Sequence, residues 1–292
     1  MDRLVFLLGT GVARGTVLAL FALSLVLIWR ATRIVNFAAG AMAVVGVYVG
    51  VAVTGATGSW WWGLLATVVA GGLLGLVVER GVLRFASARS PLSGVILAIG
   101  LVVVLQSLLG IVFGQEHEPV QPPFSDRPLQ VGGVPLLSPY DLFVVVVALG
   151  LLGALRLLFV RTSLGLQLRA AAFEPEVSRL LGVRVARMRT VGWVLAASAA
   201  SLAALLAVPN ELGLNPHAAD MLFVSAFTVA VVGGLDSPGG ALLGGLTVGV
   251  VTSVVTGYLG ATLAPVAVLG LLVLVLLLRP SGLFAQAEAR RA

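Results

Sequence analysis

The sequence predicts an all-α membrane protein, a polytopic helical bundle of about eight or nine transmembrane segments. Of its 292 residues, 59% are hydrophobic and only 10% are charged, and the mean hydropathy is +1.11. Soluble domains are about 45 to 50% apolar and about 25% charged, so no soluble fold could bury this much apolar surface. About 20 apolar residues span the hydrocarbon core, so the length allows eight or nine crossings with short loops. We therefore expect one transmembrane domain over residues 1–292.

Nine apolar stretches, separated by polar or Gly/Pro signals, predict the individual crossings. They cover residues 4–29, 34–54, 60–78, 92–113, 138–160, 190–208, 221–235, 241–257 and 262–278. The first is too long for the apolar region of a signal peptide, so we interpret it as the first span. The stretches at 34–54 and 221–235 carry glycines or are short, so each is either a full crossing or a broken or re-entrant helix.

The arginines predict the orientation, because short cytoplasmic loops carry the excess of positive charge. Four clusters contain Arg30 and Arg33; Arg80, Arg84 and Arg89; seven arginines from Arg156 to Arg189; and Arg279, Arg290 and Arg291. The loops on the opposite side are acidic or neutral and contain Glu116, Glu118, Asp126, Glu211 and Asp220. With nine crossings, the N-terminus lies outside and the C-terminus lies in the cytoplasm.

Residues 114–137 form the longest predicted external loop, and five prolines exclude a helix there. This loop either contacts a solute-binding protein or is a solvated connector. The indoles of Trp60, Trp61 and Trp62 predict an anchor at the membrane interface. Gly71, Gly72 and Gly75 predict close helix packing, because small residues let helix backbones approach in lipid.

The residue content argues against an enzyme. Cysteine and lysine are both absent, which excludes disulfides, thiolate metal sites and the lysine of a phosphate-binding loop. If ATP drives this protein, another chain must hydrolyse it. His117 and His217 fall in predicted external loops, and no stretch has an ionisable residue at its centre. We therefore expect no catalytic residue, no cofactor and no metal. The net charge of +6 comes from arginines beside apolar segments, which disfavours nucleic acid.

Two interruptions by polar residues and glycine predict a translocation path. One contains Asn36, Phe37 and Gly40, and the other contains Gly233, Gly234 and Ser237. Unwound backbone is tolerated in a membrane only where it is buried or lines a wet cavity, and two breaks in related places point to a substrate site. Close interhelical packing through glycine is the alternative interpretation.

Residues 161–190 form a predicted cytoplasmic loop that contains a short helix. Pro175 suits the first helical position, Glu176 suits the positive helix end, and Gly182 suits a left-handed stop. An apolar side made by Val177, Leu180 and Leu181 needs a partner. A groove on a soluble motor subunit and the chain's own membrane helices both fit this requirement.

This loop resembles the coupling loop of permeases of branched-chain amino-acid ABC importers, the LivH/LivM type, at Arg169, Ala170 and Gly182. Three further stretches agree, in the family's order. They are Ile34 to Ala38 with Gly40, the glycine-rich run from Gly233 to Gly245, and Arg279 to Phe284.

The resemblance implies a permease subunit in a bacterial inner membrane that works with ATP-binding cassette subunits, a second homologous permease subunit and an extracytoplasmic solute-binding protein. Contact with the ATPase subunits is then expected at Arg169, Ala170, Glu174, Glu176, Val177, Leu180, Leu181 and Gly182. Ser178 stands where the family usually has alanine, and Ala39 and Ala41 replace polar or acidic residues. The expected solute is a small polar molecule, with branched-chain amino acids as the leading interpretation, and the changes at Ala39 and Ala41 keep urea or short amides as the alternative within the family. An ion-coupled carrier or channel, or a membrane-embedded enzyme, would be a different class.

Overall fold

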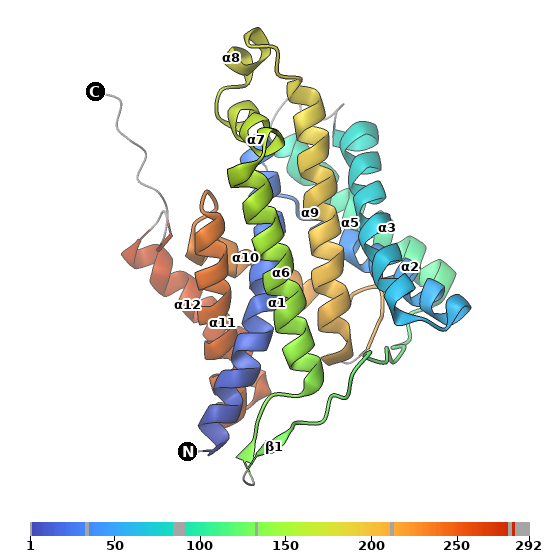
Figure 1. The fold of residues 1–292 in the computed structure, drawn as a ribbon, viewed down its shortest axis with the longest axis vertical. Coiled ribbons are helices and arrows are strands. Elements are labelled where there is room, and N and C mark those ends of the chain that lie inside the picture. The colour runs from blue at the N-terminus through green and yellow to red at the C-terminus, as the bar shows by residue number, and fades with distance from the viewer. Residues whose placement is uncertain are drawn as a thin grey trace.

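The computed structural model describes residues 2–32, 35–83, 91–131, 134–210, 213–279 and 282–283 (Figure 1). The longer elements are α1 (Asp2–Thr32), α2 (Ala39–Thr57), α3 (Trp60–Val78), α5 (Pro91–Phe113), α6 (Pro139–Arg161), α7 (Ser163–Phe173), α9 (Val185–Ala207), α10 (Asp220–Gly233), α11 (Pro238–Leu259) and α12 (Ala264–Leu278). The short elements are the π-helical turn η1 (Glu79–Leu83), β1 (Gln130–Val131), β2 (Val134–Pro135), α8 (Pro175–Leu180), η2 (Val208–Asn210) and η3 (Ala261–Leu263). The predicted all-α architecture is confirmed.

Eight helices in the described part of the chain are long and apolar enough to cross a membrane. α10, with 14 residues, is the short exception. At about 1.5 Å per residue it measures about 21 Å, less than the hydrocarbon thickness of about 30 Å. The prediction of eight or nine segments is therefore confirmed, with 221–235 as the short one. The stretch at 34–54 instead forms α2, which is a continuous helix from Ala39.

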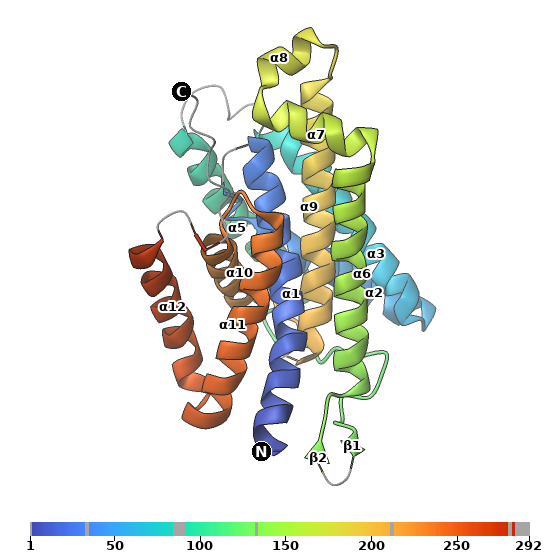
Figure 2. The same cartoon turned by 60° about the vertical axis from the view of Figure 1, so that its left-hand side comes forward.

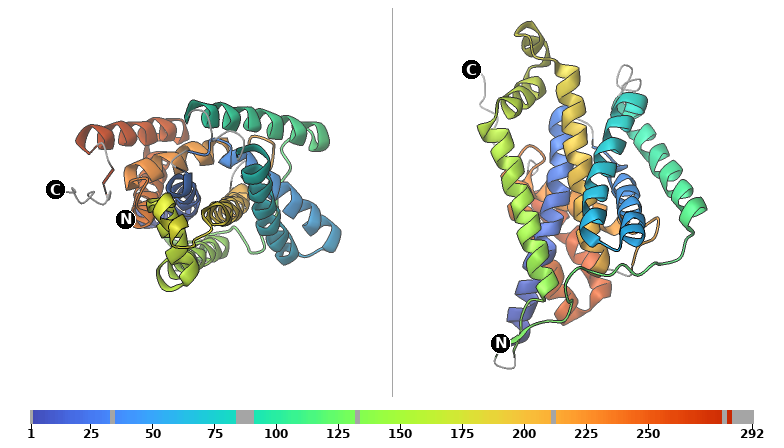
Figure 3. Two further views of the ribbon diagram at one scale, coloured as in Figure 1. Left: turned by 90° about the horizontal axis from the view of Figure 1, so that it is seen from above. Right: turned by 45° about the vertical axis from the view of Figure 1, so that its right-hand side comes forward.

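α1 occupies the centre of the bundle and packs against α11, α9, α10 and α6 (Figures 2 and 3). Leu20, Phe21 and Ala22 have no exposed surface. A helix that is apolar on every side is suited to a buried position rather than to a lipid-facing one. The other helices are arranged around this helix, so the core of the domain is built on it.

Glycines bring α1 and α11 into backbone contact. A Cβ atom on Gly11 would lie 2.8 Å from the Cα of Val250, and one on Gly15 would lie 2.8 Å from the carbonyl oxygen of Gly245. A Cβ on Gly249 would overlap the backbone of Gly15. Burying apolar side chains between helices gives no hydrophobic gain in lipid, so close van der Waals packing of this kind holds the pair together.

Glycines also bring the backbones of α3 and α9 into close contact. A Cβ on Gly75 would lie 2.8 Å from the carbonyl oxygen of Trp193, one on Gly71 would lie 2.9 Å from that of Ala197, and one on Gly72 would lie 2.6 Å from the Oγ of a serine on α9. The predicted packing role of these three glycines is confirmed.

The bundle has two chemically different ends. α7 and α8 lie at one end, together with the final turns of α1, α3 and α6, and we call it the arginine end (Figure 2). Described arginines there include Arg30, Arg80 and Arg161. The N-terminus, β1 and β2 lie at the other end, which we call the hairpin end. Arg33, Arg84, Arg89, Arg290, Arg291 and Glu211, which supported the predicted orientation, lie outside the described residues.

The described residues of the connection from α5 to α6, 114–131 and 134–138, form no helix, as the prolines predicted. β1 and β2 pair antiparallel, and the backbone of Glu118 exchanges two hydrogen bonds of 2.9 and 2.8 Å with Leu214. This second pairing ties the connection to the segment before α10. At the same end Trp60 and Trp61 pack edge-on against Phe143 of α6.

Replacing Gly249 by leucine should lower the thermal stability of the purified chain in detergent, because the new side chain meets the backbone of α1. Overpacking costs about 1 to 3 kcal/mol or more, and backbone atoms cannot move aside as a flexible side chain can. Gly270→Leu is the matched control, since a Cβ on Gly270 of α12 meets nothing within 4 Å. Equal melting temperatures for the two variants would contradict the backbone contact.

Candidate functional site

The loop at the arginine end folds into a helical pair. The side-chain oxygen of Thr162 caps α7 by accepting a 3.0 Å hydrogen bond from the backbone nitrogen of Gly165. α8 begins at Pro175, and Gly182 follows it with a φ of +84°. A left-handed residue after a helix favours glycine, because it has no Cβ. The structure thus has the predicted short helix at the predicted place.

α8 presents an apolar surface that nothing in the described chain covers. The exposed fractions are 51% for Val177, 88% for Leu180 and 78% for Leu181. Ser178, on the opposite side, is buried. We call the three exposed residues the α8 face. Within the described residues, the chain's own membrane helices leave most of the surface of Leu180 and Leu181 exposed.

α7 connects this face firmly to the bundle. Leu168 and Ala171 of α7 pack with Met188 of α9 in a small apolar cluster. A Cβ on Gly165 would lie 2.6 Å from the carbonyl oxygen of Phe159, so α7 also lies directly on the end of α6. α8 therefore projects from a base that is fixed to two membrane helices.

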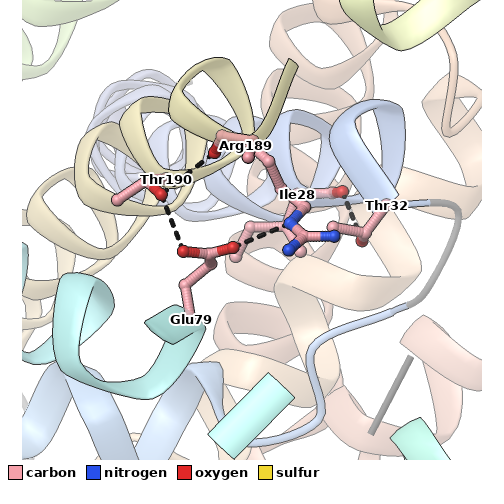
Figure 4. A network of polar contacts seen from close by, with 6 residues as sticks. Ile28, Thr32, Glu79, Arg189 and Thr190 are labelled. Carbon is pink, nitrogen blue, oxygen red and sulfur yellow. Dashed lines mark hydrogen bonds and ion pairs between the residues drawn. The ribbon is translucent and has the colours of Figure 1, made fainter. Parts of the chain in front are cut away.

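Below the loop, a buried polar network joins α3 to α9 (Figure 4). The Nε of Arg189 donates to one carboxylate oxygen of Glu79 at 2.7 Å, and the hydroxyl of Thr190 donates to the other at 2.7 Å. Glu79 is buried and opens the π-helical turn η1. Glu79 was not among the predicted site residues, although it is an acid directly after an apolar stretch and among arginines.

A cavity of about 260 Å³ lies beside this network, between α1, α5, α7, α8 and α9. Its polar lining includes Thr32, Asn36, Glu79, Arg179 and Arg189, and its apolar lining includes Met188 and Trp193. Pro175 and Arg179 of α8 line the cavity, so it lies between part of α8 and the helices below.

The Asn36 segment packs against the first half of α10. The Oδ1 of Asn36 accepts a 3.0 Å hydrogen bond from the backbone nitrogen of Ala38, which shapes the turn into α2. The ring of Phe37 lies 6.1 Å from that of Phe223 and 6.3 Å from that of Phe227. A Cβ on Gly40 would lie 3.2 Å from the carbonyl oxygen of Ala219.

The second break lies at the other end of α10. Gly233 and Gly240 are in backbone contact, and Gly234 has a φ of +94°. The hydroxyl of Ser237 caps α11 by accepting a 3.0 Å hydrogen bond from the Gly240 nitrogen. Ten residues of helix, about 15 Å, separate Gly233 from Phe223. The two breaks thus bracket α10 and do not meet in one site.

A polar trio of Gln106, His217 and Asp220 lies where α10 begins. The sequence did not predict that these three residues meet. The side-chain nitrogen of Gln106 donates to one oxygen of Asp220 at 2.9 Å, and the Nδ1 of His217 lies 3.0 Å from the other. Gln106 is in the candidate span Gly94–Phe113, seven residues or about 10 Å before its end. The sequence predicted His217 and Asp220 in an external loop. The hydrogen bond from Gln106 instead brings the Asp220 carboxylate to the level of Gln106 within the span of α5. Ionisable groups at such depth usually mark a functional surface.

Replacing Arg189 by leucine should destabilise the chain by about 3 to 5 kcal/mol, because it leaves the buried Glu79 carboxylate without its cation. Glu79→Gln should cost less, since the partly exposed Arg189 can still reach water. The double variant should recover part of the loss of Arg189→Leu alone. Unfolding in detergent measures all three, with Arg187→Leu, at an exposed position on α9, as the control. Additive losses would show that the pair does not interact.

Comparison with known proteins gives a consistent set of relatives. Residues 7–278 match the family described as "Branched-chain amino acid transport system / permease component". The LivH protein of Salmonella typhimurium, a "High-affinity branched-chain amino acid transport system permease protein", is 28% identical over 294 residues, which cover 96% of this chain and 95% of that protein. BraD of Pseudomonas aeruginosa, with the same description, is 28% identical with the same coverage.

A solved structure extends the likeness to the fold. PsaBC from Streptococcus pneumoniae in complex with Fab aligns with a TM-score of 0.53 at 12% identity, over 93% of this chain and 91% of that one. At this identity the match concerns the arrangement of the helices alone.

Proposed function

The chain belongs to the permease-component family of branched-chain amino-acid transport systems, and on this premise we propose that it carries a branched-chain amino acid across the bacterial inner membrane, driven by ATP hydrolysis on separate subunits. The observation that carries this proposal is the α8 face, an exposed apolar surface at the arginine end. The α8 face is an exposed apolar surface of about two helical turns, on a loop outside the membrane-spanning helices. Such a surface fits a groove on a soluble ATP-binding cassette subunit.

The coupling step follows from how α8 is held. α7 is packed on α6 and α9, so a displacement of α8 by a moving partner is transmitted to both helices. The pair of Glu79 and Arg189 then connects α9 to α3. Arg169, Ala170, Glu174, Glu176 and Gly182 belong to the same loop and complete the proposed contact region.

We place the translocation path along the exposed side of α10, beside α2 and α5. Gln106, His217 and Asp220 supply hydrogen-bonding groups for an amino acid's charged ends, and Phe37, Phe223 and Phe227 supply an apolar surface for its side chain. Asn36 and Gly40 position one end of α10, and Gly233, Gly234 and Ser237 hold the other. This surface is open in the single chain, so a second permease subunit would close it.

The arginine end is assigned to the cytoplasm by the positive-inside rule. The hairpin end then faces outward, where residues 114–137 can receive a solute-binding protein, and the C-terminus is cytoplasmic. The aromatic side of the proposed path favours an apolar amino acid over urea or a short amide, because urea has no apolar group to bury there.

Replacing Leu180 by serine should reduce solute uptake by the assembled importer about tenfold or more while the chain still folds, because the side chain is 88% exposed and anchors the motor contact. Leu259→Ser, at an exposed leucine where α11 ends at the opposite end of the bundle, is the matched control. Uptake of labelled leucine and ATPase activity in proteoliposomes provide the two readouts. Unchanged coupling in Leu180→Ser would refute this role of α8.

The absence of cysteine allows a direct test of orientation. A single cysteine at Leu180 should react with a membrane-impermeant maleimide only from the cytoplasmic side, and one at Leu129 only from outside. The opposite pattern would invert the proposed topology. Uptake by the isolated chain under an ion gradient would favour a secondary carrier instead.

Replacing Asp220 by asparagine should lower uptake about tenfold, the size of effect expected when a hydrogen bond to a charged group is lost, without changing the melting temperature, since this side chain is half exposed. Asp2→Asn, at the start of α1 and outside every proposed contact region, is the control. If both variants transport like the parent chain, the path does not use the polar trio.

A further inference from the structure

A second cavity, of about 600 Å³, opens between α1, α6, α7 and α11 at the arginine end, away from the proposed path. Most of its lining is hydrocarbon. Leu23 and Leu27 of α1 contribute buried side chains, Leu149, Leu152 and Phe159 come from α6, and Leu242 comes from α11. We call this cavity the α6/α11 groove.

The end of the groove nearest to the loop is positively charged. Arg30, Arg156 and Arg169 line it together with Asp236, so positive charge is in excess. Arg30 and Asp236 already take part in other polar contacts. The groups that we assign to a ligand are therefore Arg156 of α6 and Arg169 of α7, both of which are exposed.

Arg156 lies at a level that matches a lipid headgroup. It precedes Arg161, the last residue of α6, by five residues, or about 7.5 Å along the helix. A charged side chain at this depth must reach the interface or pair with an opposite charge. A guanidinium binds a phosphate through two parallel hydrogen bonds. An anionic phosphate beside Arg156 satisfies this requirement.

The groove continues from these arginines along α6 as an apolar channel. Gly153 lines it, and a Cβ on Gly153 would meet nothing within 4 Å. A chain of methylene groups can therefore lie over Gly153 and Leu149. A free phosphate ion would leave this hydrocarbon surface uncovered, whereas an acyl chain would cover it.

We propose that the α6/α11 groove binds one anionic phospholipid, with its phosphate on Arg156 and Arg169 and an acyl chain along Gly153. Basic pockets between transmembrane helices on the cytoplasmic side suit such headgroups. Arg169 belongs to α7, which carries α8, so the bound lipid contacts the same loop as the proposed motor contact. The lipid site itself does not depend on the transport proposal.

Binding to the full chain in detergent can be measured by native mass spectrometry with added dioleoyl phosphatidylglycerol or dioleoyl phosphatidylcholine. The parent chain should bind the anionic lipid about tenfold more tightly, the size expected for two basic residues near an anionic headgroup, because the choline cation of the neutral lipid offsets the attraction of its phosphate to the arginines. Arg156→Gln should reduce this preference, since one of the two assigned guanidinium groups is lost. Gly153→Leu should weaken binding of both lipids, because the new side chain fills the groove.

Two variants on the same helix are matched controls. Arg161→Gln removes an arginine, and Gly150→Leu adds a side chain where a Cβ meets nothing within 4 Å, but neither residue lines the groove. Both should bind lipid like the parent chain, and melting temperatures verify that all four variants fold.

Four results would overturn the proposal. Three of them are equal binding of the two lipids by the parent chain, equal losses in groove and control variants, and displacement of the lipid by millimolar inorganic phosphate, which would indicate a simple anion site. A fourth is disulfide cross-linking of a single cysteine at Gly153 to another subunit of the assembled importer, which would make the groove a protein interface.

Discussion

The backbone of α1 lies against that of α11, and this contact sets the geometry of the rest of the bundle. In lipid, apolar side chains gain nothing by leaving one hydrocarbon surface for another, so helices associate where their backbones can approach. Gly11 and Gly15 meet the backbone at Val250 and Gly245. With α1 fixed at the centre, α9 and α10 are positioned on its remaining sides. The positions of the loop at 161–190, of the polar network at Glu79 and of the exposed side of α10 all depend on that arrangement.

Among the described residues, one buried charged contact joins two helices close to the loop at the arginine end. Glu79 joins the end of α3 to the start of α9 and is itself buried. Since removing one partner of a buried pair costs more than the pair contributes, such a contact fixes the register of the two helices more than it adds stability. The turn at Glu79 is π-helical, and π-helical turns are frequent at functional sites. The network is thus well placed to transmit motion from α7 and α9 to α3.

Local signals predicted the fold well where chemistry acts over a few residues. Pro175 and Gly182 gave the limits of α8, and the prolines of 114–137 gave the extended connection. The start of the sixth stretch was placed at 190, five residues late, because Arg187 and Arg189 look like loop residues. In the fold Arg189 is paired with Glu79, more than one hundred residues away, and such a partner leaves no trace in the local pattern.

The candidate site was less predictable for the same reason. Asn36 and Gly234 were identified as breaks, but their separation along α10 comes from how α2, α10 and α11 pack. The bond between Gln106 and Asp220 joins two helices whose sequences give no hint of contact.

At the arginine end, α7 connects two surfaces for which we propose different partners. Its continuation, α8, presents an apolar face beyond the span, whereas Arg169 lies in the α6/α11 groove at the level of the headgroups. A ligand can bias two states of a loop only if its affinity differs between them. Arg169 lies on α7 and Arg156 on α6, so a tilt of α7 relative to α6 would change the distance between the two arginines. An anionic group held by both arginines would therefore favour one position of the loop, and the lipid composition of the membrane would then influence coupling through the helix that we propose to receive the motor's motion.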